Sequence, residues 1–154
     1  IMPRLRKPKY GPTDLTFQKM KRRAFRLHTS EQVKDFHNKQ GSLLQGKIEQ
    51  LTIKAHEAHS NSLLAKSGRK AELLQEEIDL WTQIFFLNTR TGMIADVSKQ
   101  AIEKLRKRGA ITDEEYRHFK AIAEANLQAR LKRNHELIDK LVSLGELRVA
   151  AESN

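Results

Sequence analysis

Residues 44–66 read LQGKIEQLTIKAHEAHSNSLLAK, and this stretch decides the fold class. Apolar or small residues recur along it at alternating steps of four and three. That spacing keeps them on one face of an α-helix and is typical of the seam of a coiled coil or a long helical hairpin. We therefore expect an all-α protein with long helices. The seam consists of Leu44, Ile48, Leu51, Ala55, Ala58, Ser62 and Ala65.

Helical periodicity continues on both sides of this stretch, and no proline follows residue 12. Gly41 predicts a bend before the long helix, and Ser67 with Gly68 predicts a turn after it. A second turn is expected at Asn-Thr-Arg-Thr-Gly, residues 88–92. We expect further helices at about 30–40, 69–87, 93–108 and 113–149.

The clearest predicted boundary lies at the start of the last helix. Basic residues at 104 and 106–108 complement the negative end of a helix dipole, and Gly109 is a typical helix stop. Thr112 and Glu115 then match a capping box.

The predicted core stripe of the last helix follows this boundary and contains Tyr116, Ala123, Leu127, Leu131, Ile138 and Leu141. Together the segments predict an elongated bundle of antiparallel long helices with coiled-coil character over residues 29–149, then a short tail at 150–154.

Residues 1–28 form a basic arm that differs in composition from the rest of the chain. The arm has nine basic residues and one acid, whereas the remaining 126 residues have 20 basic and 18 acidic residues. All three prolines lie in its first dozen residues, so we expect an extended segment followed by a short helix. We also expect the arm to become ordered on binding a partner.

The arm suits a polyanionic partner, because its cations can displace counterions from phosphates and its aromatic rings can stack on bases. Nucleic acid, DNA or RNA, is the predicted partner, bound with little sequence preference. Alternatives are a solvated tail, an anionic membrane surface, an acidic protein or a mitochondrial targeting sequence. The predicted contacts are Arg4, Arg6, Lys7, Lys9, Lys19, Lys21, Arg22, Arg23 and Arg26, with Arg106, Lys107 and Arg108 as a second group.

A cluster of apolar residues at 80–87 has two interpretations. Six of these eight residues are apolar, which is more than one helix face can hide. The cluster is either the centre of the core or a hydrophobic docking surface for protein. In the second case the interface residues are Leu80, Trp81, Phe85 and Phe86.

Residues 102–121, IEKLRKRGAITDEEYRHFKA, resemble the short bihelical module known as SHOCT. The pattern is a leucine-bearing helix, a glycine, and then Ile-Thr, an acid, Glu and an aromatic residue. The resemblance covers 20 of the 154 residues and implies a role in oligomerisation or nucleic-acid contact.

Residues with the potential for catalysis are sparse. His56 and His59 share a helix face, and Glu115 with His118 forms one Glu-x-x-His pair, whereas a di-iron site needs two such pairs. We interpret both sets as solvated surface residues and expect no metal and no cofactor. The sequence contains no phosphate-binding glycine loop and no nucleophile elbow, so we expect a protein that is not an enzyme.

The composition of the chain excludes several classes of protein and of binding site. The chain has no cysteine, which excludes disulfides and thiolate zinc sites. No window is apolar enough to span a bilayer, and we expect a soluble, intracellular, cytoplasmic protein.

The leading hypothesis is a nucleic-acid-binding or nucleoprotein-assembly component. The alternative is a helical adaptor or scaffold that acts through its coiled-coil seam and hydrophobic patch, and in either case homo-oligomers are possible.

Overall fold

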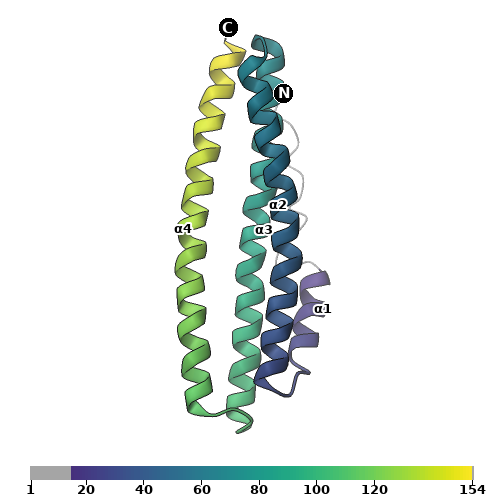
Figure 1. The fold of residues 1–154 in the computed structure, drawn as a ribbon, viewed down its shortest axis with the longest axis vertical. Helices are drawn as coiled ribbons and strands as arrows, with labels where there is room; N and C mark the ends of the chain where they lie inside the picture. Colours follow the sequence, from purple (N-terminus) through teal and green to yellow (C-terminus); the bar gives the residue numbers. More distant parts are fainter. Residues whose placement is uncertain (1–14, 154) are drawn as a thin grey trace. The chain divides into compact units, whose positions relative to one another are not determined.

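The computed structural model describes residues 15–153, and within them it is all-α with no strand. The helices are α1 (Leu15–Ala24), α2 (Ser30–Leu64), α3 (Ser67–Lys107) and α4 (Asp113–Glu152) (Figure 1). The prolines of the basic arm and its first four cations, Arg4, Arg6, Lys7 and Lys9, lie outside the described residues.

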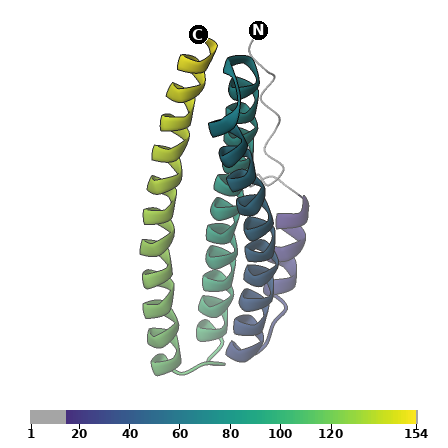
Figure 2. The same cartoon turned by 45° about the horizontal axis from the view of Figure 1, so that its top comes forward.

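The chain forms two compact units. Unit 1 comprises Ile1–Leu43 and Thr89–Gln128, and unit 2 comprises Leu44–Asn88 and Ala129–Asn154. Parts of α2, α3 and α4 therefore belong to each unit, while α1 belongs to unit 1 alone. Both ribbon views show α1 beside the first part of α2 (Figures 1 and 2).

Two predicted breaks are wrong, because α2 and α3 are continuous helices of 35 and 41 residues. Among residues 15–153 only Gly109 has a positive φ, so Gly41 and Gly92 keep a helical backbone. Asn88 does not cap a turn. Its Nδ2 instead donates to Asn134 Oδ1 of α4, 2.6 Å away. Glycine and asparagine favour turns, but unlike proline they can remain inside a helix. Here the Asn88 side chain has a hydrogen-bond partner on another helix, so α3 continues through it.

The core of unit 2 lies between segments of three helices. Its central cluster of buried residues consists of Ala55 from α2, Leu74, Trp81 and Ile84 from α3, and Leu137, Leu144 and Ala151 from α4. The seam predicted on residues 44–66 lies on the inner side of α2, where each member is buried or partly buried. The small seam residues Ala55, Ala58 and Ser62 are fully buried, which permits close approach of α3.

The predicted core stripe of α4 is wrong in part. Tyr116, Ala123 and Leu141 are partly buried, and Leu141 packs against the core of unit 2. Leu127, Leu131 and Ile138 are exposed, whereas the buried α4 residues of unit 2 repeat every seven positions at Leu137, Leu144 and Ala151. The helix also continues through residues 150–152, which we expected to be a tail. The sequence of α4 contains two apolar stripes with helical spacing, and in unit 2 the structure buries mainly the one that was not predicted.

The core of unit 1 includes α1. Met20 and Ala24 of α1 are buried, so the second half of the expected arm is part of a folded unit. The other buried apolar residues of unit 1 come from α2, α3 and the loop before α4: Val33, Phe36, Ile94, Val97, Ala101, Ile102, Leu105 and Ile111.

The boundary between α3 and α4 confirms the sequence prediction. Gly109 has φ +71°, its N–H donates to Arg106 O, and the Ala110 N–H donates to Leu105 O at 2.9 Å, which is a Schellman motif. Thr112 Oγ1 accepts from the Glu115 N–H at 3.1 Å and Glu115 Oε1 accepts from the Thr112 N–H, which completes the capping box. Glu115 also accepts a hydrogen bond from Ser30 Oγ at 2.9 Å and so connects α4 to the start of α2.

We expect Gly46→Ala and Gly109→Ala to have opposite effects on stability. Gly46 lies within α2, and a Cβ there would meet no atom within 4 Å, so alanine should stabilise by about 0.5–1 kcal/mol. At Gly109 the positive φ should make alanine destabilising by about 1–2 kcal/mol. Urea denaturation followed by circular dichroism measures both. Destabilisation by Gly46→Ala would contradict the helical assignment of that residue.

The pKa of Glu115 is lowered from its ordinary value of 4.5, mainly by the hydrogen bond from Ser30 and then by those from Thr112. A carboxyl group with a lowered folded-state pKa adds stability above its unfolded pKa, and this is lost as the pH falls through the folded pKa. We expect Ser30→Ala to raise the pKa of Glu115 towards 4.5, as measured by NMR titration. Thr29→Ala is the control, because Thr29 caps α2 by accepting from the Gln32 N–H and its hydrogen bond does not involve Glu115. Equal shifts in both variants would refute the Ser30 link.

Candidate nucleic-acid interface

The net positive charge of the protein lies in one unit. Unit 1 has 19 basic and 9 acidic residues, a net charge of +10, whereas unit 2 has 10 of each and is neutral. Within residues 15–153, unit 1 still has 15 basic and 8 acidic residues, a net charge of +7. Unit 1 is therefore the candidate surface for a polyanion.

Helix α1 is amphipathic, and its cations lie opposite its buried side. Met20 and Ala24 are buried, while Lys19, Arg22 and Arg23 are exposed and Lys21 is partly exposed. Arg26, just after the helix, is also exposed. Burial of one side of α1 holds the predicted cations of residues 19–26 on a folded surface.

Phe25 connects α1 to the C-terminal turns of α3. The Lys104 Nζ lies 4.1 Å from the centroid of the Phe25 ring, and the Lys21 Nζ lies 5.6 Å from it. Both ammonium groups are attracted by the π-electrons of the ring. This contact places Lys104 of α3 beside the cations of α1, although Lys104 and Lys21 are 83 residues apart in sequence.

The second predicted group is only partly available. Arg106 stacks on Tyr116 with its Cζ 4.1 Å from the ring centroid, and its Nη2 lies 3.5 Å from Asp113 Oδ1. Lys107 and Arg108 are exposed. We therefore assign Lys104, Lys107 and Arg108 to the candidate surface and interpret Arg106 mainly as a contact between α3 and α4. The sequence pattern did not identify Lys104 as a contact, because its partner Phe25 lies in a distant segment.

The predicted protein-docking residues lie in unit 2, and Trp81 belongs to its core. Trp81 is buried, donates from Nε1 to Glu77 Oε2 at 2.9 Å, and has Lys140 Nζ 4.0 Å from its ring centroid. Leu80, Phe85 and Phe86 are partly buried. The structure thus places Trp81 where the core interpretation expected it.

The two candidate metal pairs have other contacts. His59 Nδ1 lies 2.9 Å from Glu77 Oε1, and the His56 ring meets Trp81 edge-on. Glu115 is held by Ser30 and Thr112. Within residues 15–153, no group of three or more His, Asp or Glu side chains is placed to hold a metal ion.

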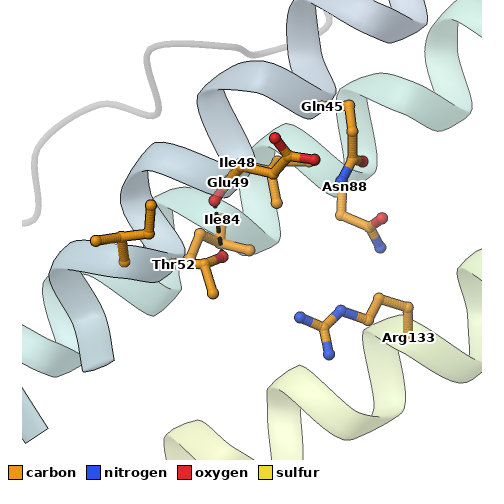
Figure 3. A pocket seen from close by; sticks show the side chains of 8 residues that line it. Gln45, Ile48, Glu49, Thr52, Ile84, Asn88 and Arg133 are labelled. Atoms are coloured by element: carbon orange, nitrogen blue, oxygen red, sulfur yellow. Dashed lines mark hydrogen bonds between the residues drawn. The ribbon is translucent and has the colours of Figure 1, made fainter. Parts of the chain in front are cut away.

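An open groove of about 690 Å³ lies within unit 2. Side chains of α2 and α3 form one side, and Arg133 reaches across from α4 (Figure 3). Three of its polar side chains have partners in the protein: Thr52 donates to Ile48 O, Asn88 to Asn134, and Arg133 to Glu136. With these groups already paired, the groove is a weaker candidate site than the cationic surface.

Comparison with protein-family models, curated proteins and solved structures finds no match to this chain. In the part of the chain that the structure describes, no helix is apolar over a length sufficient to cross a membrane. The candidate surface is therefore argued from its own geometry and charge.

We expect Phe25→Ala to loosen α1. Loss of the ring contact with Lys104 and Lys21 should lower the local opening free energy by about 1–2 kcal/mol, which accelerates amide hydrogen exchange in residues 18–24 by about 5- to 30-fold. Mass spectrometry measures the exchange, and Phe25→Leu is the matched control that keeps apolar bulk without a ring. Unchanged exchange in Phe25→Ala would show that Phe25 does not hold α1.

Proposed function

We propose that this protein binds nucleic acid through the cationic surface of unit 1, as a non-enzymatic binding or nucleoprotein-assembly component. The observation that carries the proposal is that, within residues 15–153, the whole net charge of +7 lies in unit 1, while unit 2 is neutral. The surface is defined here by Lys19, Lys21, Arg22, Arg23, Arg26, Lys104, Lys107 and Arg108, and the predicted contacts Arg4, Arg6, Lys7 and Lys9 precede it in sequence.

The lysines and arginines of this surface are suited to binding phosphate groups. Each lysine or arginine that neutralises a phosphate releases a condensed counterion, and this release drives binding without reference to base sequence. The aromatic residue at its centre, Phe25, already has Lys104 and Lys21 against its ring, so we do not assign it to base stacking. Binding should therefore show little sequence preference.

The acids of unit 1 limit the extent of the surface. Asp113, Glu114 and Glu115 occupy the first turn of α4 and would repel phosphates. The interface accordingly runs over α1 and the end of α3 rather than along α4. The SHOCT-like stretch, residues 102–121, contributes Lys104, Lys107 and Arg108 to it, in keeping with the nucleic-acid role that the resemblance implies.

The alternative function is a helical adaptor that recruits protein through apolar surface and coiled-coil pairing. The observation that favours it is the exposure of Leu63 and Leu64 at the end of α2, where Leu64 is 91% exposed. Trp81 cannot test this alternative, because its substitution would disturb the core of unit 2.

The decisive experiment compares two triple variants that remove the same charge. Arg22, Arg23 and Arg26 are changed to Gln in one, and the exposed Lys47, Lys54 and Lys66 of unit 2 in the other. Substitution is preferable to deletion of residues 1–28, since deletion would also remove the buried Met20 and Ala24. Fluorescence anisotropy with random-sequence DNA and RNA is measured from about 50 to 200 mM salt.

We expect the arginine triple to weaken binding and to reduce the slope of log affinity against log salt by about 2.7 for duplex DNA, which corresponds to three lost phosphate contacts. The lysine triple should leave the slope nearly unchanged. Equal effects of the two triples would refute a defined surface. Absence of binding by the unmodified protein at about 50 mM salt would favour the adaptor function.

A further inference from the structure

Within unit 2, helix α4 has a second apolar stripe that the core does not use. Leu131, Ile138, Val142 and Val149 are 47%, 45%, 58% and 53% exposed. Their steps of seven, four and seven residues are heptad spacing, and His135 and Gly145 occupy the two remaining positions of the repeat. At 3.6 residues per turn, this outer stripe lies about 130° around the helix from the buried stripe of Leu137 and Leu144.

The outer stripe also has an apolar depression at its C-terminal end. Val142, Gly145 and Val149 line it, and a Cβ at Gly145 would meet no atom within 4 Å. An exposed seam of this kind, with a side-chain-free position in it, matches the surface onto which another helix packs in a coiled coil.

The stripe is symmetric about its own centre, which points to a second copy as the occupant. In an antiparallel pair centred on residue 140, Ile138 of one copy faces Val142 of the other, and Leu131 faces Val149. His135 then faces Gly145, where the absence of a side chain leaves room for the imidazole ring. A two-fold contact requires this self-complementarity, because each residue must meet the partner position that meets it in return.

The flanking charges support the same pairing. Lys132 and Glu146 lie on the outer edge of the stripe, and the antiparallel arrangement places Lys132 of each copy beside Glu146 of the other, which makes two ion pairs. A parallel arrangement would instead place His135 against His135 and Gly145 against Gly145 of the other copy. It would form no ion pair between Lys132 and Glu146. Asp139 falls at the two-fold axis and faces its own copy, which weakens the contact.

We propose that this protein forms an antiparallel homodimer through the outer stripe of α4, residues 131–149. The interface is one helix pair of about 28 Å, at the small end of protein interfaces, so dimerisation is expected at micromolar concentrations. Its test is sedimentation equilibrium of the full chain from about 1 to 200 µM, after nuclease treatment.

Two matched variants locate the interface. Val142→Glu places two carboxylates, one from each copy, near the centre of the apolar seam and should raise the dimer dissociation constant at least about tenfold. Leu147→Glu is the control, since Leu147 is 52% exposed on the same helix but lies outside the stripe. Circular dichroism verifies that both variants fold. Equal loss of dimer in the two variants would overturn the proposal, as would a wild-type protein that stays monomeric over the whole range.

Charge reversal tests the orientation. Lys132→Glu alone and Glu146→Lys alone should each raise the dissociation constant by about 3- to 30-fold, and the double variant should return it to about the wild-type value. Asp139→Asn should tighten the dimer, because it removes the repulsion at the axis. A double variant no better than the single ones would overturn the antiparallel pairing. All these residues lie in the neutral unit 2, so the outcome does not depend on nucleic-acid binding by unit 1.

Discussion

Unit 2 is organised around a carboxylate buried between two helices. Glu77 of α3 is buried, and its two oxygens accept from Trp81 Nε1 on the same helix and contact His59 Nδ1 on α2. A buried carboxylate without partners would be strongly destabilising, so the side chains of α2 and α3 must meet at this position. The small residues Ala55, Ala58 and Ser62 on α2 allow the two backbones to approach closely enough for these contacts to form. Within unit 2, these contacts tie one position of α2 to one position of α3.

The features that local chemistry determines were predictable from the sequence. The left-handed backbone that ends α3 favours a glycine at position 109, and Thr112 with Glu115 satisfies free N–H groups at the start of α4. Both features depend only on residues that are close in sequence. The continuity of α3 through residues 88–92 was not predictable in this way. There, Asn88 has its partner on α4, and a tertiary hydrogen bond replaces the local one that a turn would have offered.

The same reasoning explains which parts of the candidate surface were found. The cations of residues 19–26 were evident from composition, because charge density needs no knowledge of the fold. Lys104 became part of the surface only through its contact with Phe25, which no periodicity encodes. The choice between the two apolar stripes of α4 is of the same kind, since each has helical spacing and only the neighbouring helices select the buried one. Residue types with catalytic potential, such as His59 and Glu77, are used for packing and hydrogen bonding.

The burial of Trp81 has a practical consequence for spectroscopy. It is the single tryptophan of the chain, and it lies in the core of the neutral unit with Glu77, His56 and Lys140 around its indole ring. Intrinsic tryptophan emission therefore reports on that core alone, whereas the far-ultraviolet dichroism of the long helices reports on both units. A comparison of the two signals during denaturation separates the melting of one unit from that of the other without any added label.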